Sequence, residues 1–237
     1  MKIKKKFKVI GFIPAKKNST GLKNKNLKKI NNLSLVELAI TSSIKSKKVD
    51  QTFLSSDSEI ILNIGKKYNI QTIKRKKSLC KKTTNANEII KDFINFYTNT
   101  YKDYKNVIVI YLQPTSPFRN FNHIDLSIKK FIKSKKKILV SFLEIKNFFK
   151  AFEIKKKKIT PFFNSKYINE NRQNFPKILV PNGALYIFYL KDFLKNKKLT
   201  YNSCAYYQMN KIDSLDIDDE LDFKIAKFLS KNNIKSK

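Results

Sequence analysis

The sequence predicts an α/β protein in which a mostly parallel sheet carries helices on both faces. Strand and helix patterns alternate from residue 7 to about residue 143, as expected for parallel strands, because each pair needs a long crossover connection. The segment 106–112 is apolar without alternation, as strands are when both faces of the sheet are covered. The length of 237 residues fits one such domain, so we expect a single unit over 1–237.

The N-terminal half supplies the first alternating elements. Residues 7–13 form an apolar run that predicts a first strand, and a polar loop follows. Ser34 is a suitable N-cap for the first helix. In the next helix, Ile60, Ile61 and Ile64 are expected on one buried face because of their spacing. The expected elements are a helix from 34 to 44, a strand 52–55, a helix 57–68, a strand 70–73 and a helix 87–101.

The C-terminal half continues this alternation on both sides of an irregular segment. From about 148 to 181 the pattern lapses into turns, lysine runs and aromatic residues. This predicts a small excursion from the sheet, which could carry a dimer contact. The expected elements around it are strands 106–112, 138–143, 184–190 and 203–209, and helices 120–133 and 220–229.

The formal net charge of +33 suggests nucleic-acid binding, since clustered Lys and Arg release counterions from phosphates. However, all but three of the 51 basic residues are lysines, and these are spread over the whole length. Such a composition is typical of an AT-rich coding bias that acts at exposed positions. We therefore expect a general, salt-sensitive attraction to polyanions and no specific nucleic-acid partner. The exceptions to this bias mark special positions, because Arg has a planar bidentate fork that Lys lacks and Gly has free access to positive φ. These exceptions are Arg75, Arg119, Arg172, Gly21 and Gly183.

Cysteine usage and hydropathy indicate a cytoplasmic protein. Cys80 and Cys204 are too few for a disulfide framework or a cysteine-based zinc site. No apolar run approaches the ~18–20 residues that a membrane helix needs. The basic start is followed by a short apolar stretch that Lys8, Gly11 and Pro14 interrupt, which does not fit a signal peptide.

Two segments with polar and cationic residues directly follow predicted strands. Residues 13–26 read IPAKKNSTGLKNKN, and backbone N–H groups and ammonium ions of such a loop can wrap a polyphosphate. Its spacing is not that of a Walker loop, and a lysine-rich surface loop is the alternative. Residues 112–119 read LQPTSPFR after the central strand, where open parallel sheets bind ligands. A purely structural turn is the alternative there.

Two further segments lie in the C-terminal third. Residues 181–186 read PNGALY, and an Asn-Gly pair before a strand is by itself most often a hairpin turn. Residues 213–222 read DSLDIDDELD, with six carboxylates. In an extended chain Asp216 and Asp218 point the same way, and two converging carboxylates suit Mg²⁺ that also binds substrate phosphates. Acidic residues at a helix N-terminus are the alternative, and both interpretations can hold together.

Together these segments resemble the CMP-sugar synthetase family, and within it the acylneuraminate (sialic acid) and legionaminic acid cytidylyltransferases. The resemblance runs from Val9 to about Phe228 and includes the strand end SSD at 55–57. It implies a three-layer nucleotide-diphospho-sugar transferase (Rossmann-like) fold, most often a homodimer through the excursion. The implied reaction couples CMP from CTP to the anomeric hydroxyl of a nine-carbon acidic sugar and releases pyrophosphate, with Mg²⁺ as cofactor.

The resemblance also implies residue roles. For the nucleotide phosphates and ribose it implies Lys16, Ser19, Lys25 and Asn26. It places Arg75 beside the cytosine, and Gln113, Asn182 and Tyr186 on the sugar side. It assigns Mg²⁺ to Asp216 and Asp218, so that Lys16, Lys25 and this pair form the catalytic group. Lys150 and Arg172 resemble the cations that meet the sugar carboxylate.

Two departures from the family pattern concern activity and specificity. The family most often has Arg where Lys16 stands, so a bidentate phosphate contact becomes a point charge. A basic residue is often found where Val180 stands, which bears on the identity of the sugar. No general base stands out, since His123, the single histidine, is expected in the first turn of a helix.

Two alternative functions remain open from the sequence. The Kdo cytidylyltransferases share the fold and the chemistry, but they have a different loop after the first strand, without the Lys25-Asn26 pair. A polyanion-binding protein with an inactive enzyme fold is the alternative from another functional class.

Overall fold

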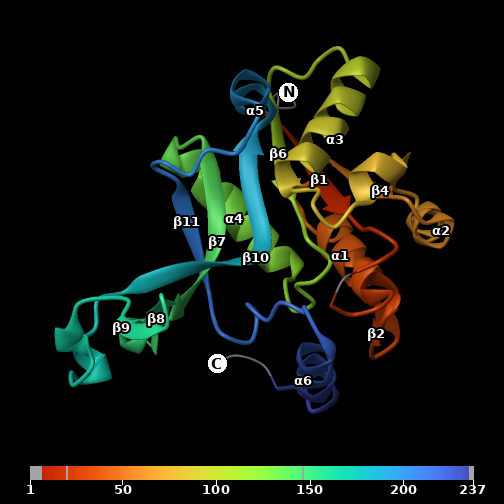
Figure 1. Cartoon of the computed structure of the whole chain (residues 1–237). Helices are drawn as coiled ribbons and strands as arrows, with labels where there is room; N and C mark the ends of the chain where they lie inside the picture. Colours follow the sequence, from red (N-terminus) through yellow and green to blue (C-terminus); the bar gives the residue numbers. More distant parts are fainter. Residues whose placement is uncertain (1–6, 20, 146, 235–237) are drawn as a thin grey trace.

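A twisted sheet forms the centre of the molecule, shown in Figure 1. The computed structural model describes residues 7–19, 21–145 and 147–234. Over these residues the sheet has seven strands in the order β11-β7-β10-β6-β1-β4-β5. These strands are β1 (Lys8–Pro14), β4 (Gln51–Ser56), β5 (Gln71–Lys74), β6 (Val107–Tyr111), β7 (Ile138–Ile145), β10 (Ile178–Tyr189) and β11 (Ala205–Met209).

Most neighbouring strands are parallel, as the sequence predicts. β1 pairs in parallel with β4 and β6, β4 with β5, and β7 with β11. β10 is the exception, because it runs antiparallel to both β6 and β7. The Asn182-Gly183 pair lies inside this long strand at a register shift, with Gly183 at φ 74°. The pair therefore forms a bulge rather than a hairpin turn, and only a glycine adopts this backbone conformation without strain.

Helices cover both faces of the sheet and one end of it. They are α1 (Leu35–Ile44), α2 (Glu59–Lys67), α3 (Ala86–Thr100), α4 (Phe121–Ser134), α5 (Leu190–Asn196) and α6 (Glu220–Lys231). β6 shows how the layers form: Ile108 and Ile110 pack with α1, α2 and α4, whereas Val107 and Val109 pack with α3 and α5. This three-layer arrangement confirms the predicted fold class. A third apolar cluster joins α6 to the loop after β1 through Leu22.

The helix starts follow local capping chemistry. Ser34 caps α1 as predicted, and its side chain forms a capping box with Glu37. Asn120 caps α4 in the same way with His123 in the first turn, which confirms the expected place of that histidine. In α2 one prediction was wrong: Ile60 is 61% exposed, and Leu62 is buried in its place beside Ile61.

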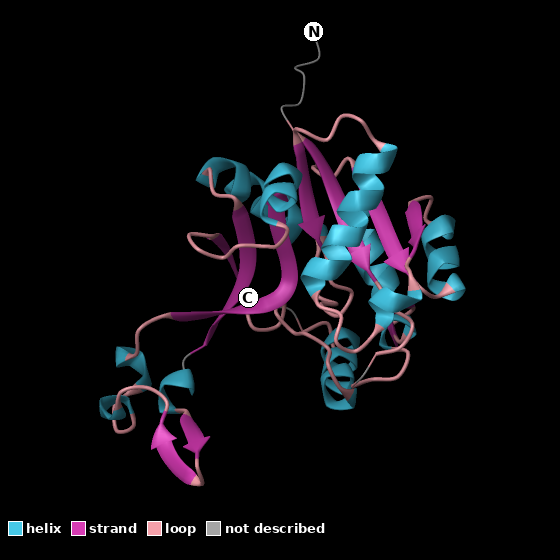
Figure 2. Cartoon of the chain, turned by 45° about the horizontal axis from the view of Figure 1, so that its top comes forward, coloured by secondary structure: helices cyan, strands magenta, loops and turns pink. Residues whose placement is uncertain are grey.

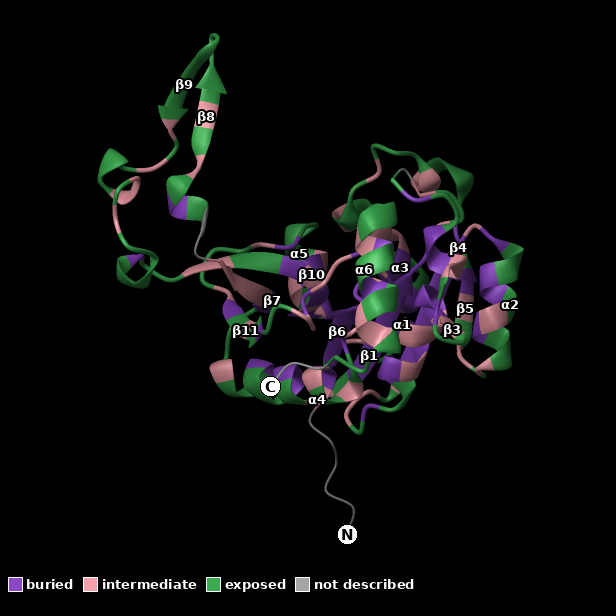
Figure 3. Cartoon of the chain, turned by 90° about the horizontal axis from the view of Figure 1, so that it is seen from below, coloured by how far each residue is buried: buried purple, intermediate pink, exposed green. Residues whose placement is uncertain are grey.

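Residues 148–177, here called the arm, stand apart from the sheet between β7 and β10 (Figure 2). The arm contains the hairpin β8 (Phe152–Lys155) and β9 (Lys158–Pro161) and is held together by aromatic contacts around Phe149. Figure 3 shows that most of its surface is exposed. β10 begins at Ile178, so the last four residues of the expected excursion belong to the sheet. The short strands β2 (Lys29–Ile30) and β3 (Leu33–Ser34) form a separate hairpin before α1.

Candidate active site

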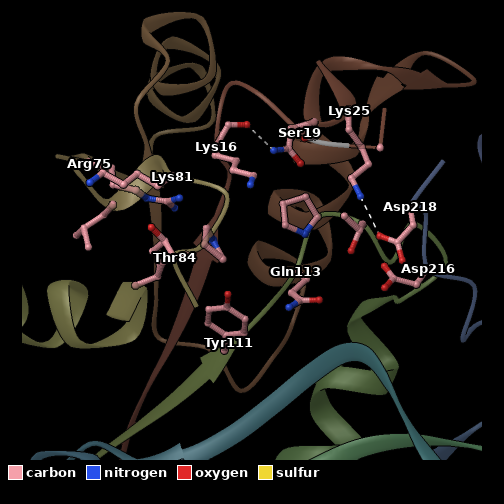
Figure 4. Close-up of a pocket in the computed structure, with 17 residues that line it drawn as sticks. Lys16, Ser19, Lys25, Arg75, Lys81, Thr84, Tyr111, Gln113, Asp216 and Asp218 are labelled. Atoms are coloured by element: carbon pink, nitrogen blue, oxygen red, sulfur yellow. Dashed lines mark hydrogen bonds and ion pairs between the residues drawn. The ribbon is translucent and has the colours of Figure 1, made fainter. Parts of the chain in front are cut away.

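A pocket of about 460 Å³ opens at the carboxyl ends of β1 and β6. Figure 4 shows side chains from four parts of the chain that line it. They come from the loop after β1 (residues 15–19 and 21–28, the cationic loop), from the segment after β5, from the end of β6 and the turn after it, and from residues 213–222 (the acidic segment). All seven predicted nucleotide and metal residues line this pocket together with Gln113: Lys16, Ser19, Lys25, Asn26, Arg75, Asp216 and Asp218.

Hydrogen bonds fix the cationic loop beside the strand ends. The backbone N–H of Lys17 donates to Asp57 Oδ1 at 2.7 Å, and the Asn26 amide donates to the backbone carbonyl of Lys16 at 2.8 Å. Gly21 lies so close to the acidic segment that a Cβ atom there would be 2.3 Å from the backbone oxygen of Asp218. The loop backbone is therefore shaped by Asn26 and Gly21, and the Lys16 side chain is left to face the pocket.

Arg75 forms a buried cationic wall of the first pocket. Its side chain is 3% exposed and donates to Ser55 Oγ at 3.2 Å and to the Ser55 carbonyl at 2.9 Å. Burial lowers the pKa of Arg75 from its usual value. Nearby, burial raises the pKa of Tyr111 to about 12, so that this hydroxyl stays protonated at neutral pH. Both groups can therefore act as fixed hydrogen-bond donors.

The acidic segment directs two of its six carboxylates into the pocket. Asp219 and Asp222 form the capping box of α6, and Glu220 pairs with Lys28. Asp216 and Asp218 remain for the pocket. The helix N-terminus interpretation is therefore confirmed for Asp219 and Asp222, and the metal interpretation stays a prediction for Asp216 and Asp218.

Asp216 and Asp218 have the chemistry of a divalent-cation site. Within the described ranges, Asp216 Oδ1 is buried without a hydrogen-bond partner. Burial raises the pKa of Asp216, and the neighbouring Asp218 charge adds to this effect. No group of three or more His, Cys, Asp or Glu side chains forms a closed metal cage among residues 7–19, 21–145 and 147–234. Two open carboxylates suit Mg²⁺ shared with phosphates, so the pair fits that ion.

A second pocket of about 410 Å³ adjoins the first. The two pockets share Gln113 and Asp216, and the second is also lined by Asn182, Gly183 and Tyr186. A Cβ atom on Gly183 would lie 3.0 Å from Gln113 Oε1 and 3.3 Å from Asp216 Oδ2. The β10 bulge thus brings its backbone against Gln113 and Asp216, which line both pockets. Of the other predicted sugar-side residues, Asn182 and Tyr186 line the second pocket.

The side chain of Asn182 forms its hydrogen bonds within the protein. Its Oδ1 accepts from Ser141 Oγ at 2.6 Å and from the Ala184 N–H at 3.2 Å, and its amide donates to Ser214 Oγ at 2.8 Å. These bonds join β7, β10 and the acidic segment. Asn182 therefore shapes the wall of the second pocket, and its own side chain has few groups left for a ligand.

Two predicted sugar residues do not reach either pocket within one chain. Lys150 and Arg172 are exposed residues of the arm. The Lys150 ammonium lies 5.9 Å from the ring centre of Phe175, which is also in the arm. Neither residue lines the first or the second pocket.

Several pocket residues were missed by sequence reasoning. Lys81 and Thr84 line the first pocket from the segment between β5 and α3, and Ile89 lines it from the first turn of α3. Their signal was weak, since a lysine and a threonine after Arg75 do not stand out in a lysine-rich chain.

Arg119, which the composition did single out, donates through one Nη to the backbone carbonyls of Gln113 at 2.7 Å and Ala184 at 2.8 Å. Its burial lowers its pKa to about 9.

The protein has a three-layer α/β fold with two adjoining pockets at the ends of its strands. One solved structure of similar fold is that of CMP:2-keto-3-deoxy-manno-octonic acid synthetase complexed with CTP, with a TM-score of 0.70 and 11% identity over 96% of this chain and all of that chain. Another is a cytidylyltransferase from Leptospira borgpetersenii, with a TM-score of 0.57 and 16% identity over 97% of this chain and 89% of that chain. At these identities the likeness shows the fold alone.

A family model described as "Cytidylyltransferase" matches residues 10–234. The chain belongs to this family, and the resemblance drawn from its motifs is confirmed.

Sequence relatives are more specific. An N-acylneuraminate cytidylyltransferase of Escherichia coli is 31% identical over 92% of this chain and 51% of its own length. A post-translational flagellin modification protein B of Campylobacter coli is 27% identical over 97% of this chain and 98% of its own. A CMP-N,N'-diacetyllegionaminic acid synthase of Campylobacter jejuni is 27% identical over 93% and 94%. The chain thus spans about half the length of the N-acylneuraminate enzymes and nearly all of the two Campylobacter proteins.

Proposed function

We propose that this protein transfers CMP from CTP to the anomeric hydroxyl of a nine-carbon acidic sugar and releases pyrophosphate. The observation that carries the proposal is the junction of the two pockets at Gln113 and Asp216. A triphosphate bound in the first pocket would have its α-phosphorus beside a sugar bound in the second. The names of relatives support the sugar class, since they include N-acylneuraminate, legionaminic acid and pseudaminic acid enzymes.

On the nucleotide side, we assign the triphosphate to the cationic loop. Lys16 and Lys25 supply positive charge, Ser19 a hydroxyl, and Asn26 fixes the loop backbone. Arg75 is assigned to the cytosine, because it is buried at the end of the pocket away from the acidic segment (Figure 4). These groups need only bind and orient the nucleotide, since phosphoryl transfers depend mainly on positioning and charge neutralisation.

We assign Mg²⁺ to Asp216 and Asp218. When bound there, the ion would supply charge neutralisation for the phosphates and lower the pKa of the attacking hydroxyl. Asp216 lines both pockets, which supports assigning this carboxylate to the point where the two substrates would meet.

The proposed reaction forms one bond and breaks one. The anomeric oxygen bonds to the α-phosphorus, the bond from that phosphorus to the bridging oxygen breaks, and pyrophosphate leaves with its electron pair. The hydroxyl proton is assigned to solvent, and His123, the single histidine of the sequence, lines neither pocket. Tyr186 and Gln113 would orient the sugar, and burial raises the pKa of Tyr186 to about 12, so it remains a donor at neutral pH.

Nucleotide selectivity tests the proposed function. With Mg²⁺ present, CTP should bind more tightly than UTP or ATP, by on the order of tenfold or more. The reason is that two buried hydrogen-bond donors, Arg75 and Tyr111, line the pocket to which the base is assigned. Isothermal titration with each nucleotide measures this difference. Equal affinities for the three nucleotides would mean that the first pocket binds triphosphates without reading the base.

We also propose that the protein is a homodimer assembled through the arm and that it acts in the cytoplasm. The arm exposes apolar side chains on its hairpin: Phe152 is 51%, Ile154 76% and Ile159 67% exposed. A second copy would cover them. For Lys150 and Arg172 to meet a sugar carboxylate, the arm of one copy has to approach the second pocket of the other. Cys80 and Cys204 are free, and no described helix is long or apolar enough to cross a membrane.

The dimer proposal makes a specific prediction for the hairpin. Ile154→Asp should shift the protein from dimer to monomer, because an unpaired carboxylate in an apolar interface costs several kcal/mol. Light scattering after size exclusion measures the mass. Ile60→Asp, at a residue 61% exposed on α2, is the matched control and should remain dimeric. A parent protein that is monomeric at micromolar concentration would contradict the proposal.

A further inference from the structure

Lys25 lies in an unusual position for a lysine in this chain. Its residue is 9% exposed, although most lysines here are on the surface. Its ammonium donates to the backbone carbonyl of Ile217 and lies 3.2 Å from Asp218 Oδ1. Figure 4 shows this side chain crossing from the cationic loop to the acidic segment, beside Asp216. The Lys25 ammonium therefore lies next to the two carboxylates assigned to the metal.

The backbone around Lys25 is held in place independently. Leu22 packs with Ile217 and Phe223 in one apolar cluster, and the Lys28 ammonium pairs with Glu220 at 3.2 Å. The cationic loop and the acidic segment are thus joined on both sides of Lys25. A change in the partners of its ammonium requires only rotation of the flexible side chain, while the loop stays where it is.

The charges explain why this side chain would change partners. The Asp218 side chain is 80% exposed, so its attraction to one ammonium is weakened by solvent. A triphosphate carries several negative charges and would bind in the pocket that Lys25 lines. A divalent cation on Asp216 and Asp218 would in turn be repelled by an ammonium that stays beside them.

We infer that Lys25 is an internal counter-cation that pairs with Asp218, beside Asp216, in the free protein and moves to the triphosphate when CTP binds. This inference rests on the proposed function and adds a coupling to it. CTP binding would remove the ammonium from Asp218 and so strengthen the divalent-cation site. The same residue would therefore oppose metal binding before the nucleotide arrives and support nucleotide binding afterwards.

The inference predicts that removing the Lys25 charge has opposite effects on metal binding and on CTP binding. Lys25→Met keeps the length of the side chain and removes its charge. Without nucleotide, the variant should bind Mn²⁺ about tenfold more tightly than the parent, because the repelling charge is gone. With EDTA present, it should bind CTP about tenfold more weakly, because a phosphate contact is gone. Electron paramagnetic resonance measures free Mn²⁺, and calorimetry measures CTP binding.

Lys28→Met is the matched control, since Lys28 is in the same loop and also pairs with an acidic residue, but it does not line the first pocket. It should change neither affinity by more than about twofold. A Lys25→Met variant that weakens both ligands would show a purely structural role, and one that behaves like Lys28→Met would show no coupling. Either result overturns the inference.

Two further variants separate this inference from the metal assignment. Asp216→Asn and Asp218→Asn should each weaken Mn²⁺ binding. If they do so while Lys25→Met is silent, the inference alone is wrong. If Mn²⁺ binding is unchanged in both, the metal assignment is wrong and the inference is overturned with it.

Discussion

Asp216→Asn or Asp218→Asn is expected to lower CTP turnover by ~10²-fold or more, on the scale of removing one group that stabilises transition-state charge. Asp216 and Asp218 are the carboxylates of the acidic segment that face the pocket, whereas Asp219 and Asp222 cap α6. Steady-state kinetics at saturating Mg²⁺ measure the effect. Glu220→Gln, on the same segment but paired with Lys28, is the control and should keep near-normal turnover.

Stability should respond differently from activity in the Asp216 variant. Burial raises the pKa of the Asp216 carboxyl, so its ionised form at neutral pH costs folding free energy that is absent below the ordinary pKa of aspartate. Asn removes this cost, and the melting temperature at pH 7 should stay equal or rise. Near-normal turnover in either aspartate variant would remove the proposed metal role, whatever the melting temperature.

Lys16→Ala is expected to lower kcat/KM for CTP by ~10–10³-fold, from the loss of a charge-assisted phosphate contact. Lys16 lines the first pocket, whereas the adjacent Lys17 is exposed and does not. Lys16→Arg should keep or improve kcat/KM, because its fork can donate two parallel bonds where Lys offers one compact charge. Kinetics with CTP varied at saturating sugar compare the two variants.

Unchanged kcat/KM in the Lys16 variants would contradict the proposed phosphate contact. If both substitutions are silent, Lys16 is one more solvated lysine of a strongly basic chain. An alanine variant within twofold of the parent would mean that the cationic loop does not bind the triphosphate as proposed. Lys25 and Lys81 also line the pocket and would then have to supply its charge.

The sequence predicted the layers of the fold because the patterns that form them are local. The apolar run at β6 and the N-cap at Ser34 depend on neighbouring residues alone. The α5 helix was missed, because its seven residues follow β10 without a loop and are too few to show a helical period. The bulge at Gly183 was read as a turn candidate, since Asn-Gly has the same local chemistry in both settings.

The site was predictable where a motif lies on a strand end and less so elsewhere. The cationic loop and the turn after β6 meet because β1 and β6 are parallel neighbours and end at one edge of the sheet. The acidic segment follows β11 instead, and its Ile217 N–H joins it to that turn by donating to the Thr115 carbonyl at 2.9 Å. Asn182 was expected beside the sugar, but Ser141 and Ser214, far apart in the sequence, bind it first. Lys150 and Arg172 were expected beside the sugar, but they lie on the arm, which extends away from the sheet (Figures 1 and 2), and neither residue lines a pocket of its own chain.

Release of pyrophosphate from CTP tests the central claim most directly. The purified protein is incubated with CTP, Mg²⁺ and one sugar at a time from a panel of nine-carbon acids of the sialic, legionaminic and pseudaminic types, with eight-carbon Kdo for comparison. The account predicts release that requires a sugar and is fastest with one of the nine-carbon acids. No release with any sugar, or release with Kdo alone, would contradict it.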